Sequence, residues 1–189
     1  MMELFRVFTL IALSRKGPQD LPASPILLAL AVVGYFLANY TMTLLMPPVD
    51  SWRVHLMVGV VFTLGWYAVL LRAFGKSERF LQTATAMFGY LLVLTPLSVT
   101  ATYLMTRKYP DDSLLQFPVA VIGIAVLIWV VRAGSYVLKA ALELPMIACV
   151  VLIVLQILAG ELVMGALTPP GQTGDIVEEV SKPNATGQR

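Results

Sequence analysis

Residues 144–167 read LPMIACVVLIVLQILAGELVMGAL and carry one charged side chain, Glu161. A helix of about 20 apolar residues is long enough to cross the hydrocarbon core of a bilayer. Four further runs of similar length and polarity precede this one, at residues 26–46, 54–72, 81–105 and 114–135. We therefore predict an all-α fold in which residues 26–168 form a polytopic membrane bundle of five transmembrane helices.

Composition supports the same class and excludes several functions. Hydrophobic residues make up 58% of the 189 residues, charged residues only 13%, and the mean hydropathy is +0.82, which is far from the values of a soluble domain. The net charge of +2 includes no dense basic cluster, so we expect no nucleic-acid partner. One cysteine, Cys149, and one histidine are too few for a zinc site, and we expect neither a metal nor a cofactor.

The first 25 residues differ from the rest. Leu4, Phe8 and Ile11 follow helical spacing while Glu3 and Arg6 point elsewhere, which is typical of a short amphipathic helix lying at the membrane interface. A frayed lead-in is the alternative, and the early acidic residue argues against a cleaved signal peptide. At the other end we expect residues 169–189, which are polar, to be a disordered tail.

The distribution of basic residues predicts the orientation, because Lys and Arg are retained on the cytoplasmic side. With five crossings, three residues lie near the membrane on the outer side: Arg53, Arg107 and Lys108. Eight lie on the opposite side: Arg6, Arg15, Lys16, Arg72, Lys76, Arg79, Arg132 and Lys139. We therefore expect a cytoplasmic N-terminus and a periplasmic C-terminus in a bacterial inner membrane.

Polar residues inside the predicted spans are costly and need partners. Glu161 lies in the outer part of the last span, and its candidate partners at that depth are His55, Arg53, Arg107 and Lys108. A Glu facing a His could relay protons, whereas a Glu paired with a basic residue would only hold helices together. For Asn39 and Gln156, bridging between neighbouring helices is the expected role.

The third predicted span contains Pro96 among several hydroxyl side chains. Proline removes a backbone donor and favours a kink, and neighbouring hydroxyls can satisfy the carbonyls that it frees. Such a helix could line a solute path or could simply be a kink buried in the bundle.

One motif points to a known family. It consists of an inner loop followed by a glycine–aromatic pair and a proline in span three: Gly75-Lys76-Ser77-Glu78-Arg79-Phe80-Leu81-Gln82-Thr83, then Gly89-Tyr90 and Thr95-Pro96. With the five predicted helices, this pattern resembles the Yip family of integral membrane proteins, especially its bacterial branch. The resemblance implies a membrane scaffold or organiser that acts through helix and loop contacts with protein partners, lipid or copies of itself.

Two functional hypotheses follow. The first is a non-enzymatic interaction protein whose cytoplasmic residues Arg72, Lys76 and Arg79 dock partners or anionic lipid, unless these charges only set the topology. The second is a small permease or transporter subunit that uses Pro96, Gln156 and Glu161. We expect no enzymatic activity, because the sequence offers neither paired carboxylates nor a nucleophile with its base.

Overall fold

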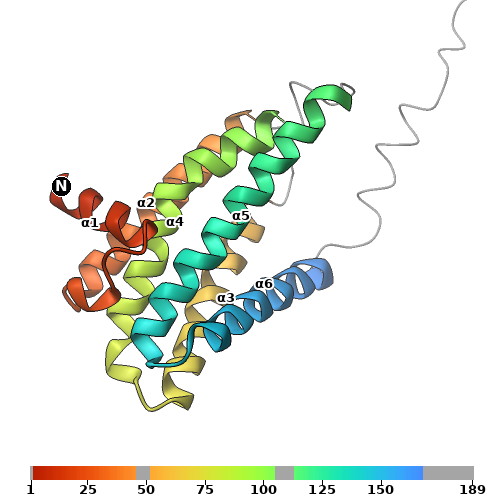
Figure 1. Cartoon of the computed structure of the whole chain (residues 1–189). Coiled ribbons are helices and arrows are strands. Elements are labelled where there is room, and N and C mark those ends of the chain that lie inside the picture. The colour runs from red at the N-terminus through yellow and green to blue at the C-terminus, as the bar shows by residue number, and fades with distance from the viewer. Residues whose placement is uncertain (1, 46–51, 105–112, 168–189) are drawn as a thin grey trace, which may run out of the picture.

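A computed structural model describes residues 2–45, 52–104 and 113–167 (Figure 1). The predicted tail 169–189, together with Arg107 and Lys108, lies outside the described residues. All regular structure in the described ranges is helical. The elements are α1 (Met2–Ala12), η1 (Pro18–Asp20), α2 (Pro25–Leu45), α3 (Trp52–Ala73), η2 (Ser77–Arg79), α4 (Phe80–Tyr103), α5 (Ser113–Leu142) and α6 (Met146–Leu167).

The helices α2 to α6 coincide with the five apolar runs of the sequence. Among the described residues, four helices are long and apolar enough to cross a membrane: α3, α4 with the preceding η2, α5 and α6. The described apolar part of α2, Pro25–Thr41, is shorter. The all-α fold and its membrane-type helices are thus confirmed, whereas a fifth crossing by α2 stays a prediction.

Helix α5 is longer than the predicted span 114–135, because it continues without a break to Leu142. Its last turns carry Ala133, Gly134, Ser135, Val137 and Leu138, which are all buried. Small residues allow neighbouring helices to approach closely, and this packing explains why the helix persists beyond the apolar run.

Helix α4 lies at the centre of the bundle and contacts α1, α2, α3 and α5 (Figure 1). An unbroken stretch from Thr83 to Tyr90 is buried. By contrast, α6 is the least buried of the four candidate spans and diverges from α5 after their shared loop, as Figure 1 shows. The molecule therefore has a tightly packed part around α4 and an open part in which α3 and α6 present apolar side chains outward.

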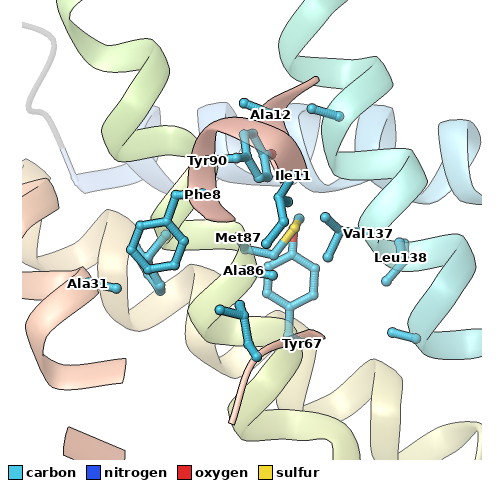
Figure 2. Close-up of a cluster of buried hydrophobic side chains, with 14 of the residues drawn as sticks. Phe8, Ile11, Ala12, Ala31, Tyr67, Ala86, Met87, Tyr90, Val137 and Leu138 are labelled. Carbon is cyan, nitrogen blue, oxygen red and sulfur yellow. The ribbon is translucent and has the colours of Figure 1, made fainter. Parts of the chain in front are cut away.

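The N-terminal helix α1 packs against this centre. Its residues Phe8, Ile11 and Ala12 are buried, and Figure 2 shows Phe8 and Ile11 in a cluster that includes Met87 and Tyr90 of α4. The segment is a packed helix, so the alternative of a frayed lead-in is wrong. The apolar face predicted to enter lipid instead contacts protein, because α4 and α5 offer it an apolar surface.

Two hydrogen bonds fix the N-terminal segment. The Trp129 indole Nε1 of α5 donates to the Ala12 carbonyl at the end of α1, 2.7 Å away. The Gln82 amide Nε2 of α4 donates to the Leu21 carbonyl just after η1, at 2.9 Å. Because each bond ties a backbone group of the segment to a different helix, residues 2–21 belong to the folded bundle.

Candidate functional site

Three connecting segments meet at one end of the bundle, which we call the basic end: residues 13–24, 72–80 and 139–145. The Gln82–Leu21 hydrogen bond joins the first segment to α4, and η1 also contacts α5. The second and third segments are joined by an ion pair between Lys76 and Glu143. These are the segments that the charge count places together on one side of the membrane.

Glu143 is the centre of a charge cluster at the basic end. Lys76 Nζ lies 2.9 Å from its Oε2, and Arg79 Nη2 lies 2.8 Å from its Oε1. Hydrogen bonds from Lys76 and then from Arg79 hold the pKa of the Glu143 carboxyl below its usual value of 4.5. The carboxylate is exposed, so salt will screen this cluster.

Arg79 also caps the end of α5. Its Nη1 donates to the carbonyls of Ala140 and Ala141, at 3.3 and 3.1 Å. The last carbonyls of a helix lack backbone partners and carry a partial negative charge, so a guanidinium is favourable there. One arginine thus satisfies both the helix end and the neighbouring carboxylate.

The backbone of Glu143 explains where α5 ends. Its φ of 61° is left-handed, and its amide donates to the Lys139 carbonyl at 2.8 Å. This is the αL form of helix termination, which usually uses glycine because a side chain is disfavoured there. Sequence reasoning missed Glu143 because no glycine or asparagine marked the position. An acidic residue between Lys139 and Pro145 was the available signal.

The predicted docking residues therefore have different environments. Lys76 and Arg79 are partly covered and paired with Glu143. Arg72 is exposed in the last turn of α3, and Phe74 beside it is also exposed. Of the three basic residues proposed for docking, Arg72 has the most freely presented side chain.

The basic end also contains a cavity of 310 Å³, lined by Pro18, Gln19, Arg79, Gln82, Ala140 and Glu143. Its two charged residues, Arg79 and Glu143, already neutralise each other. The cavity therefore has no net charge that would select an anion or a cation.

A side-chain hydrogen bond joins the two helices of the open part. Tyr67 Oη of α3 donates to Gln156 Oε1 of α6 at 2.5 Å, and Tyr67 is buried. The amide of Gln156 thus bridges helices, as the sequence suggested. Asn39, by contrast, donates to the Tyr35 carbonyl of its own helix at 2.9 Å.

Pro96 lies inside α4 and is exposed on the outside of the bundle. The Thr95 hydroxyl donates to the Leu91 carbonyl at 2.8 Å, next to the Leu92 carbonyl that loses its usual donor. Pro96 lines none of the cavities described in this section. The geometry at Pro96 is that of a proline accommodated at the surface of a packed helix.

Glu161 lies at a second cavity, of 320 Å³, between α2, α3 and α6. Its other polar lining residues are Tyr35, Thr63 and Gln156, and Phe62 forms part of the wall. Within the described part of the chain, no hydrogen bond or ion pair reaches the Glu161 carboxylate. The structure thus brings Gln156 and Glu161 to one cavity.

The register of α3 and α6 separates Glu161 from His55, whereas the side chains of the other expected partners, Arg53, Arg107 and Lys108, lie outside the described residues. Contacts at the helix glycines place Gly59 opposite Met164 and Phe62 opposite Gly160, so Glu161 lies level with Phe62. His55 lies seven residues before Phe62, which at 1.5 Å per residue is about 10 Å along the helix. This register does not favour direct pairing between the side chains of His55 and Glu161.

Four buried polar atoms have no hydrogen-bond partner among the described residues. They are Trp66 Nε1, Thr83 Oγ1, Thr85 Oγ1 and Ser135 Oγ. A threonine or serine hydroxyl in a helix can turn to a carbonyl of the preceding turn, so the three hydroxyls do not by themselves mark a site. Nowhere in the described ranges do three or more His, Cys, Asp or Glu side chains gather as metal ligands would.

Comparisons with protein-family models, with curated proteins and with solved structures find no match to this chain. The basic end and the Glu161 cavity are therefore the features of this chain that bear on its function.

Proposed function

We propose that this chain is a non-enzymatic integral membrane protein of Yip-like type, a scaffold or organiser that acts through contacts with protein partners or lipid. It crosses a bacterial inner membrane five times, with the N-terminus in the cytoplasm and the C-terminus in the periplasm. The basic end faces the cytoplasm in this arrangement.

The assembly of the basic end is the observation that supports this proposal. Segments from three parts of the chain are held together by the Glu143 cluster, by the capping of α5 and by the Gln82–Leu21 bond. Because the segments of this surface are already fixed, little conformational entropy is lost when a partner binds, and this favours recognition. The same end carries the excess of basic residues that marks a cytoplasmic face.

The docking residues at this end are Arg72 and Phe74. Both are exposed and lie in the connection between α3 and η2, beside the clamped pair Lys76 and Arg79. Phenylalanine and arginine are both enriched at protein–protein interfaces relative to the rest of the surface. Lys76 and Arg79 act indirectly, because they hold the loop in shape.

The test is crosslinking in native membranes from a photoreactive residue placed at Phe74. We expect protein or lipid adducts that are lost when Arg72→Glu is added. Arg132→Glu, which reverses another exposed basic residue, is the matched control and should leave the adducts unchanged. Adducts that are insensitive to Arg72→Glu would contradict docking at this surface.

A permease or transporter subunit is the second candidate. The specific observation in its favour is the cavity that holds Gln156 and Glu161 within the open part of the bundle. It predicts a proton or solute flux in proteoliposomes that changes with pH and is altered by Glu161→Gln. Equal flux in the two proteins across the pH range would remove this candidate.

A further inference from the structure

We propose that the cavity between α2, α3 and α6 binds an organic ammonium group, with Glu161 as the counter-ion and the rings of Tyr35 and Phe62 as aromatic walls. This inference goes beyond the docking function of the basic end. It rests on the charge, the rings and the volume of this one cavity.

Glu161 brings to the cavity a carboxyl group that has no partner among the described residues. Its carboxylate lies in a helix whose other residues from Met146 to Leu167 are uncharged. An ionised carboxylate within a membrane needs a partner, and no described side chain hydrogen-bonds or ion-pairs with it. A cation bound in the cavity would supply that partner.

Two aromatic residues form part of the cavity wall. Tyr35 comes from α2 and Phe62 from α3, and both line the cavity together with Glu161. A cation over the face of an aromatic ring is attracted by the ring quadrupole, which is how proteins recognise alkylammonium groups. A carboxylate combined with two rings selects an organic cation over a hydrated metal ion.

Each ring is held in place by a second aromatic residue. Phe88 meets Tyr35 edge-on, with the ring centroids 5.6 Å apart. Trp66 lies against Phe62, with the centroids 6.0 Å apart. Rings fixed by such contacts are preorganised, so a ligand does not have to order them.

The cavity is large enough for a small molecule. The cavity measures 320 Å³, within the range of small-molecule sites. Gly59 and Gly160 form part of the lining and leave the side chains of Met164 and Phe62 at van der Waals distance from where a Cβ atom would lie. Because Glu161 is exposed at the bundle surface, a ligand can enter from the membrane.

Two kinds of ligand present such an ammonium group: the headgroup of an aminophospholipid and a free amphiphilic amine. Both present an ammonium group next to apolar atoms, and the cavity offers matching groups to each. The arms of the experiment separate these sources.

The test is calorimetric titration of benzyltrimethylammonium into the full chain in dodecyl maltoside, a detergent without amines. We expect saturable binding that weakens at least tenfold in Glu161→Gln. Phe62→Leu, which leaves every charge in place, should weaken binding about twofold to fivefold through loss of the ring face. Glu78→Gln removes an exposed carboxylate outside the cavity and is the matched control, with unchanged binding expected.

The second arm adds short-chain phosphatidylethanolamine or phosphatidylglycerol as competitor. Competition by the ethanolamine lipid alone identifies a lipid headgroup as the ligand, and competition by neither identifies a free amine. Binding of equal strength in the wild type, Glu161→Gln and Phe62→Leu would overturn the proposal. Because the titration uses no docking partner, its failure is distinguishable from failure of the function proposed for the basic end.

Discussion

The ring of Phe8 in α1 lies directly against Gly89 in α4. A Cβ atom built on Gly89 would be 2.3 Å from Phe8 Cδ1, far closer than van der Waals contact. Gly89 thus provides the space into which α1 packs, and Phe8 fills it with a ring that is only 6% exposed. This contact is the most direct evidence that the N-terminal helix is part of the bundle.

Gly89→Ala should therefore destabilise the protein. Alanine is normally preferred to glycine inside a helix by about 1 kcal/mol, so a loss of stability would have to come from the clash with Phe8. We expect a loss of about 1–3 kcal/mol, typical of overpacking, in thermal unfolding followed by circular dichroism. Gly65→Ala is the control, because no atom lies within 4 Å of that Cβ position.

A double variant tests whether Phe8 is the cause. Phe8→Ala alone should cost about 3–5 kcal/mol by leaving a cavity. Combined with Gly89→Ala, the total should be smaller than the sum, because the added methyl group then meets no ring. Strict additivity of the two losses would contradict the contact between α1 and α4.

The same reasoning applies where α5 meets α4. A Cβ on Gly134 would be 2.8 Å from Tyr90 Oη and 3.2 Å from Ile153 Cδ1. Gly134→Ala should lower the unfolding temperature, and Tyr90→Phe, which removes the hydroxyl, should recover part of the loss. If Tyr90→Phe brings no recovery, the close approach at this point is not the source of the effect.

The Glu143 cluster predicts a pH dependence of stability. The pKa of this carboxyl is lowered in the folded protein, so its contribution is present above the unfolded-state value near 4.5 and is lost as the pH falls through the folded-state value. Between the wild type and Glu143→Gln, the difference in unfolding temperature should therefore shrink as the pH falls below 4.5.

Salt gives an independent check on the same cluster. Because Glu143 is exposed, about 1 M salt should reduce the wild-type advantage at neutral pH. A difference between the two proteins that stays constant with both pH and salt would mean that Glu143 acts through the backbone turn alone.

The hydrogen bond between Tyr67 and Gln156 should hold the open part of the bundle together. Tyr67→Phe and Gln156→Leu should each destabilise the contact between α3 and α6, with a coupling of about 0.6–2 kcal/mol in a double-mutant cycle. Unfolding in mixed micelles provides the free energies. Zero coupling would show that the bond contributes nothing to stability.

The length of the apolar runs predicted the helices well, because an apolar segment as long as 144–167 has few alternatives to a helix in a membrane. The sequence left open whether the fourth run continues as a helix through the mildly amphipathic stretch 132–139. The continuation of α5 to Leu142 depends on small residues buried by α1, α4 and α6. Hydropathy also reports how apolar a segment is but not what covers it. For this reason α1 was expected at lipid, whereas Phe8 and Ile11 pack on protein.

The site was predictable in part. Gln156 and Glu161 stood out as polar residues in an apolar run, but their cavity depends on the register of α3 and α6, which the sequence does not state. Glu143 was missed because its role depends on Lys76 and Arg79, more than 60 residues earlier in the chain. Contacts between residues so far apart in the chain can be identified only from the folded structure.

The most direct test of the membrane arrangement is the sidedness of the two ends of the bundle. Single cysteines at Ser14 and Ser77, in a chain with Cys149→Ala, would be probed in intact cells with a membrane-impermeant maleimide, and a periplasm-active phosphatase would be fused after Arg189. If the chain crosses five times with the basic end in the cytoplasm, both cysteines will be labelled only after the cells are opened, and the phosphatase will be active. Labelling of Ser77→Cys in intact cells, or an inactive phosphatase on a stably expressed fusion, would contradict five crossings with the basic end in the cytoplasm.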